Sequence, residues 1–202
     1  PELSISWRHQ LPVLGALGFR VIAPDMRGYG RSSVYENHND YAQELIVSDM
    51  LDLLDSLGRE KAIWVGHDWG SPVVWNLASH HPERCHAVAN LCVPYYTIER
   101  GLDHTINLVD RFLYPEDEYP SGQWDYMRLY EESFEEAIAP MDANVHNFTK
   151  LLFRKGNPEL EGTPARTATS RRDHALFGVR DIPDVPRDGD VVTEEDLSIY
   201  VA

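Results

Sequence analysis

Apolar residues in the first 94 positions alternate between helical spacing and short continuous runs. The helical spacing predicts helices over residues 4–17, 40–57 and 71–81. The short apolar runs predict strands over residues 19–24, 62–65 and 87–91. Continuous apolar strands that alternate with helices are typical of a parallel sheet covered on both faces, so we expect an α/β fold class for this part.

From about residue 95 the pattern changes, because Asp, Glu, Tyr, Pro and Gly become frequent and no strand is indicated. Helices are expected over residues 123–139, 143–153 and 193–202. The stretch 157–190 is rich in Pro, Gly, Arg and Asp and predicts a long irregular loop. The sequence therefore predicts two domains, an α/β core over residues 1–94 and a helical domain over residues 95–202.

Composition narrows the class of partner. The chain has 202 residues, 43% of them hydrophobic, and a formal net charge of -15. So acidic a chain repels nucleic acid and anionic membrane surfaces, which leaves a small molecule as the expected partner. No apolar stretch approaches the roughly 20 residues of a membrane span, no signal peptide is visible, and a cytoplasmic location is expected. The two cysteines, Cys85 and Cys92, form no disulfide framework. No feature indicates a cofactor, a metal or an oligomeric state.

The stretch from Gly66 to Gly70, Gly-His-Asp-Trp-Gly, contains the candidate catalytic nucleophile. Small residues around a central nucleophile, between a strand and a helix, form the nucleophile elbow, and here the central residue is Asp68. A carboxylate can attack carbon and form an ester, and the backbone N–H of Trp69 would supply half of an oxyanion hole. The alternative is an ordinary tight turn in which Asp68 only caps the next helix.

Three segments, in chain order, resemble the soluble epoxide hydrolase family of the α/β-hydrolase fold. They are Pro-Glu at 1–2 with Ser-Trp-Arg at 6–8, the run from Gly18 to Gly30, and the elbow at 66–70. The resemblance implies an α/β-hydrolase core with a helical cap, and an epoxide as substrate with water. It also implies that Tyr126, in Trp-Asp-Tyr at 124–126, polarises the epoxide oxygen, with Tyr130 in reserve.

Other parts of the family's machinery have no counterpart here. In the family, a second oxyanion N–H precedes the Pro-Glu pair, and a second tyrosine follows the segment that resembles residues 192–197. The base histidine and its acidic partner follow the last strand, and none of the nine histidines here stands in such a place. His67 lies in the motif, but its side chain is expected to point away from Asp68. We therefore expect a chain that is truncated at both ends and could be alkylated without releasing product.

Three rival interpretations stay open. A haloalkane or haloacid dehalogenase shares the Asp nucleophile and often uses the following Trp as a halide ligand, so Trp69 fits both enzymes. The tyrosine-bearing cap favours the epoxide, because an alkoxide leaving group needs a proton donor and a halide does not. A non-catalytic ligand-binding protein of the same fold would keep the pocket without the chemistry. A fragment that does not fold alone is the third possibility.

Overall fold

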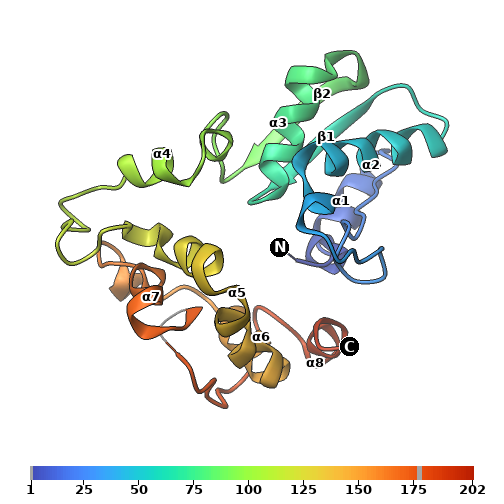
Figure 1. The fold of residues 1–202 in the computed structure, drawn as a ribbon. Coiled ribbons are helices and arrows are strands. Elements are labelled where there is room, and N and C mark those ends of the chain that lie inside the picture. The colour runs from blue at the N-terminus through green and yellow to red at the C-terminus, as the bar shows by residue number, and fades with distance from the viewer. Residues whose placement is uncertain (1, 177–178) are drawn as a thin grey trace. The chain divides into compact units, whose positions relative to one another are not determined.

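The computed structural model describes residues 2–176 and 179–202 and forms two compact units, Pro1–Glu99 and Arg100–Ala202 (Figure 1). The sequence placed this division after residue 94. Residue 1 of the Pro-Glu pair and residues 177–178 of the expected loop lie outside the described residues. Each unit is described below by itself.

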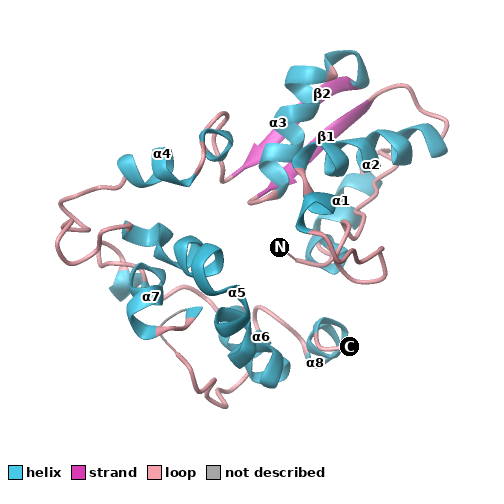
Figure 2. Cartoon of the chain, in the orientation of Figure 1, coloured by secondary structure: helices cyan, strands magenta, loops and turns pink. Residues whose placement is uncertain are grey.

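The first unit is built around a parallel pair of strands (Figure 2). Its helices and strands, in chain order, are α1 (Gln10–Ala16), α2 (Gln43–Ser56), β1 (Ala62–His67), α3 (Gly70–His80) and β2 (Cys85–Leu91). Short 3₁₀ helices cover Ser4–Trp7, His38–Tyr41, Pro82–Arg84 and Ile98–Arg100. Parallel neighbours need a crossover connection, and α3 supplies it between β1 and β2.

The core of the first unit lies where α2 and α3 meet. Val47 and Met50 of α2 pack with Val73 and Leu77 of α3, and Leu77 is fully buried. Their spacing of three or four residues places each pair on one side of its helix, which explains why the apolar periodicity predicts both helices. Trp64 of β1 packs against this cluster, so the helices cover the sheet face that carries Trp64.

The prediction that both sheet faces are covered is wrong for the part of the chain that the structure describes. Ile63 and Val65 alternate with Trp64 along β1 and are 48% and 43% exposed, and Leu91 of β2 is 47% exposed. The predicted strand over residues 19–24 is also wrong, since this segment has no regular structure. Strand structure requires a neighbour that shares the backbone hydrogen bonds, and the described sheet contains only β1 and β2.

The predicted helix over residues 4–17 divides into the 3₁₀ helix Ser4–Trp7 and α1. Pro12 explains the division, because proline has no N–H to donate to the carbonyl four residues earlier and fits only the first turn of a helix. Gly18, with φ of 91°, adopts the left-handed conformation that follows many helix ends.

The second unit is helical. Its helices are α4 (Leu102–Asn107), α5 (Asp125–Ala143), α6 (Val145–Leu152), α7 (Ser170–Asp173) and α8 (Glu194–Tyr200). The predicted helices over 123–139, 143–153 and 193–202 correspond to α5, α6 and α8, whereas α7 lies inside the expected loop. Short 3₁₀ helices cover Gly122–Trp124, Pro158–Leu160 and Arg166–Thr169.

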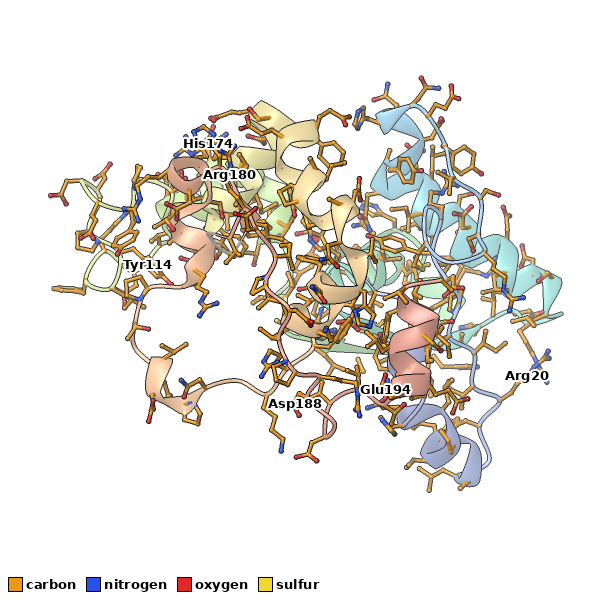
Figure 3. All side chains as sticks on the ribbon, turned by 90° about the horizontal axis from the view of Figure 1, so that it is seen from below. Arg20, Tyr114, His174, Arg180, Asp188 and Glu194 are labelled. Atoms are coloured by element: carbon orange, nitrogen blue, oxygen red, sulfur yellow. The ribbon has the colours of Figure 1, made fainter. Side chains whose placement is uncertain are left out.

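A small apolar cluster joins distant parts of the second unit. Val109 and Tyr114 pack with Ala168, and Trp124 is packed against them. The Ala165 backbone N–H donates to the Tyr114 hydroxyl oxygen at 3.1 Å, so Tyr114, labelled in Figure 3, satisfies its polar end while its ring is buried. This cluster fixes the start of α5, which follows Trp124 directly, against the segment that leads into α7.

Candidate active site

The backbone at Asp68 forms a sharp turn between β1, which ends at His67, and α3, which begins at Gly70. Asp68 has a φ of 51°, in the left-handed region that few residues with a side chain adopt. Such a conformation costs about 1–3 kcal/mol, and it is often found where a functional side chain must be presented. The strand, strained turn and helix have the form that the nucleophile-elbow motif requires.

Gly66 makes this turn sterically possible. A Cβ atom at this position would lie 2.3 Å from the Gly70 carbonyl oxygen and 2.7 Å from Cγ2 of Val74. The strand can therefore approach the start of α3 only because residue 66 has no side chain.

Hydrogen bonds attach the turn to the end of β2. The Asp68 backbone N–H donates to the Leu91 carbonyl at 3.2 Å, and the buried Ser71 hydroxyl donates to the same oxygen at 3.1 Å. The Ser71 backbone N–H donates to the Asp68 carbonyl at 2.9 Å. The turn that carries the Asp68 side chain is thus fixed from both strands.

The Asp68 carboxylate accepts a hydrogen bond from the next residue. The Trp69 backbone N–H donates to Oδ2 of Asp68 at 2.6 Å. An ordinary helix-capping carboxylate has extended backbone angles and accepts from an N–H two or three residues later. Asp68 has a left-handed backbone and the Ser71 N–H binds its carbonyl instead, so this geometry differs from a simple cap.

The surroundings of Asp68 are partly open. The Asp68 side chain is half-buried, the Trp69 side chain is 40% exposed, and His67 is exposed. His67 follows Ile63 and Val65 at alternate positions of β1, so it belongs to the uncovered face of the sheet.

Tyr29 is a neighbour of Asp68 that the sequence did not single out. Burial raises the pKa of the Tyr29 hydroxyl, and the negative charge of Asp68 raises it further. Tyr29 belongs to the glycine-rich turn between Asp25 and Ser33, and this turn was the only available signal. Arg27 attaches this turn to α2, because its guanidinium donates two hydrogen bonds to the Asp49 carboxylate of that helix, at 2.6 and 2.7 Å.

The candidate tyrosines lie in the first turns of α5, in the second unit. Tyr126 and Tyr130 are half-buried and contact each other edge to face, with ring centroids 5.8 Å apart. Tyr130 contacts Phe134 in the same manner at 6.0 Å. The structure thus brings Asp68 together with Trp69 in one unit and Tyr126 together with Tyr130 in the other.

Within residues 2–176 and 179–202, no group of three or more His, Cys, Asp and Glu side chains is arranged to hold a metal ion. In the same part of the chain, no helix is both long enough and apolar enough to cross a membrane.

The chain resembles known epoxide hydrolases over its whole length. It is 34% identical to bifunctional epoxide hydrolase 2 of Sus scrofa, with all of this chain but 33% of that protein in the match. It is 52% identical to epoxide hydrolase A of Mycobacterium tuberculosis, in a match that covers 46% of this chain and 29% of that protein. The chain thus spans about a third of the length of the curated relatives it matches.

Solved structures give the same result. The crystal structure of epoxide hydrolase A from Mycobacterium thermoresistibile matches with a TM-score of 0.73 and 33% identity, over 100% of this chain and 59% of that one. An epoxide hydrolase from an endophytic Streptomyces matches with a TM-score of 0.70 and 31% identity, over 99% of this chain and 57% of that one. The profile of the alpha/beta hydrolase fold family covers residues 2–172. The expected fold class is therefore confirmed, and the chain belongs to the alpha/beta hydrolase fold family.

Proposed function

We propose that the protein containing this chain is an epoxide hydrolase, which opens an epoxide to a vicinal diol through an ester on Asp68. The observation that carries the proposal is the Trp69 N–H, which donates to Oδ2 of Asp68 at 2.6 Å on a strained elbow. The similarity to epoxide hydrolases over the full length of the chain supports an epoxide as the substrate class.

In the proposed first step, Oδ1 of Asp68 attacks an epoxide carbon. The carbon–oxygen bond breaks, its electron pair moves to the oxygen, and the Tyr126 hydroxyl gives that oxygen a proton. An alkoxide is a poor leaving group, so this proton transfer lowers the barrier to opening. The product is a hydroxyalkyl ester of Asp68. We propose the second unit as the cap that supplies Tyr126, with Tyr130 as the reserve.

In the proposed second step, water hydrolyses the ester. Oδ2 is now the ester carbonyl oxygen, and it gains negative charge when water adds to the carbon. The Trp69 N–H already points at this oxygen and stabilises the charge, as one half of an oxyanion hole does. We assign the base that activates water to a histidine, with its acidic partner, outside these 202 residues. The histidine passes the proton that it takes from water to the departing alkoxide, which releases the diol. The second proton of water leaves the Asp68 carboxyl group and is replaced through solvent on Tyr126, so both the carboxylate and the tyrosine hydroxyl are restored.

Replacing the nucleophile tests the proposal. In the full-length protein, Asp68→Ala should abolish conversion of a styrene-oxide-type epoxide to diol, measured by chromatography. Asp52→Ala is the matched control, because Asp52 is an exposed aspartate on α2 in the same unit. Turnover by a folded Asp68→Ala variant would contradict the nucleophile assignment.

A second substrate separates the rivals. Tyr126→Phe should slow epoxide opening strongly and leave the attack on a small alkyl halide nearly unchanged, because a halide leaves without a proton. An equal loss on both substrates would assign Tyr126 to packing. Turnover of the halide alone by the unaltered protein would favour the dehalogenase, and turnover of neither would favour a non-catalytic binding protein.

A further inference from the structure

Arg171 of α7 binds the start of α5 through four hydrogen bonds. Its Nε donates to Oδ1 of Asp125 at 2.6 Å, and its backbone N–H donates to Oδ2 of the same carboxylate at 2.8 Å. Its two terminal nitrogens donate to the Ser121 hydroxyl at 2.9 Å and to Oε1 of Glu132 at 3.2 Å. One guanidinium therefore contacts Ser121 before α5, Asp125 at its first position and Glu132 further along its first segment.

The carboxylate at the centre of these contacts is buried, and its arginine partner is half-buried. The Asp125 side chain is 6% exposed and that of Arg171 is 32% exposed. Burial opposes the charged form of Arg171, but the hydrogen bond to Asp125 and its negative charge outweigh burial and raise the pKa of the guanidinium. Because an unpaired charge would be costly in this place, the two side chains hold each other in one arrangement.

These contacts fall on one face of α5, and the tyrosines fall on the next. Asp125, the buried Leu129 and Glu132 are spaced four and three residues apart, so they share a face of the helix. Tyr126 and Tyr130 each follow a residue of that face and are turned by about 100° around the helix axis. The segment ends at Ser133, where φ of -152° and ψ of 54° break the helical geometry.

We propose that Arg171 is a positioning residue that fixes the rotation of the first segment of α5 and so directs the Tyr126 hydroxyl at the epoxide oxygen. This inference rests on the proposed role of Tyr126 in proton donation. The buried Leu129 gives this face an apolar contact, and the hydrogen bonds from Arg171 to Asp125 and Glu132 hold the face at both ends. Arg128 of the same segment is paired with Asp103 of α4.

A second set of ion pairs on α5 provides a matched control. Beyond the break at Ser133, Glu136 accepts a hydrogen bond from Arg180 at 2.7 Å and lies 3.6 Å from the ring nitrogen Nδ1 of His174. Figure 3 shows the Arg180 and His174 side chains near each other. Arg180 is 59% exposed, so Arg180→Met removes an arginine that pairs with the same helix beyond its first segment.

The test measures the single-turnover rate of ester formation in the full-length protein. We expect Arg171→Met to lower this rate by roughly ten- to a hundred-fold, as a displacement of about 1 Å does, with little change in KM. Arg171→Lys keeps the charge but not the forked geometry and should recover part of the rate. Arg180→Met should stay within about two-fold of the unaltered protein, as surface substitutions usually do.

A double-variant cycle decides whether Arg171 acts through Tyr126. In the Tyr126→Phe background, Arg171→Met should lower the rate of ester formation no further. The same relative loss in both backgrounds would assign Arg171 to general stability and overturn the inference. If Arg171→Met does not fold, Asp125→Asn takes its place in the cycle, since it keeps the shape and one acceptor. If Tyr126→Phe alone has no effect, the proposed role of Tyr126 fails as well, whatever Arg171 does.

Discussion

At the level of single residues, the elbow depends both on the missing side chain of Gly66 and on the carboxylate of Asp68. The missing Cβ allows β1 to approach the first turn of α3, and this approach orients the Asp68 backbone. The motif could be recognised from the sequence because all its requirements lie within five neighbouring positions, from Gly66 to Gly70. Tyr29 could not, because its relation to Asp68 exists only after the chain folds.

Gly66→Ala should destabilise the protein by about 1–3 kcal/mol, because the added carbon would overlap the Gly70 carbonyl and the backbone must move. Gly70→Ala is the matched control, since a Cβ there meets nothing within 4 Å. Urea unfolding of both variants measures the difference in free energy of unfolding. Equal stability of the two would show that the close approach is not required.

The Asp25 carboxyl group makes the free energy of unfolding depend on pH in the acidic range. The Ser4 backbone N–H donates to its Oδ1 at 2.7 Å and lowers the pKa of this carboxyl. A lowered pKa in the folded state stabilises the protein above the unfolded value of about 3.9, and this contribution is lost as the pH falls through the folded value. Asp25→Asn should therefore be less stable than the unaltered protein at pH 7, with a difference that shrinks below about pH 4. Thermal unfolding across this range measures it, and a constant difference would contradict the assignment.

At the scale of elements, local signals were sufficient for the longer helices and insufficient for the short helices α4 and α7 and for one strand. Apolar spacing predicted α2 and α3 because each helix makes its own backbone hydrogen bonds. Residues 19–24 carry the same β-rich signal as β1, yet they are not a strand, because strand structure depends on a neighbour that spacing does not reveal. The contact between Asp125 and Arg171 spans 46 positions and could not be read from spacing either.

The start of α8 shows how local a helix signal can be. Thr193 Oγ1 accepts from the Asp196 N–H at 3.0 Å, and Asp196 Oδ2 accepts from the Thr193 N–H at 2.9 Å, which forms a capping box. Thr193→Ala should cost about 1 kcal/mol and increase hydrogen exchange in α8. Ser198→Ala, at an exposed position of the same helix, should change neither. Unchanged exchange in Thr193→Ala would show that the cap is not what holds the helix end.

At the scale of the whole molecule, the proposed chemistry is divided between two units that each have a core of their own. The division falls at Glu99 and Arg100, in an exposed stretch that follows β2. The candidate nucleophile belongs to the first unit and the candidate proton donor to the second. In the proposed mechanism, turnover uses residues of both units.

Limited trypsin digestion should reveal this division. We expect the first cut after Arg100, because it is exposed and lies where one compact unit ends and the next begins. Mass spectrometry identifies the fragments, and Arg100→Gln should delay their appearance. First cuts inside a unit, for example after Arg59, would contradict the division.

Oxygen-isotope labelling tests whether the ester forms on Asp68. An excess of the full-length protein converts an epoxide in a single turnover in water labelled with heavy oxygen. Mass spectrometry then measures the masses of the diol and of the Asp68 peptide. We expect an unlabelled diol and one heavy oxygen in the Asp68 peptide, because the new diol oxygen comes from the carboxylate and an oxygen from water replaces it there. A labelled diol with an unlabelled Asp68 peptide would show that water attacks the epoxide directly, and would contradict the proposed function of Asp68.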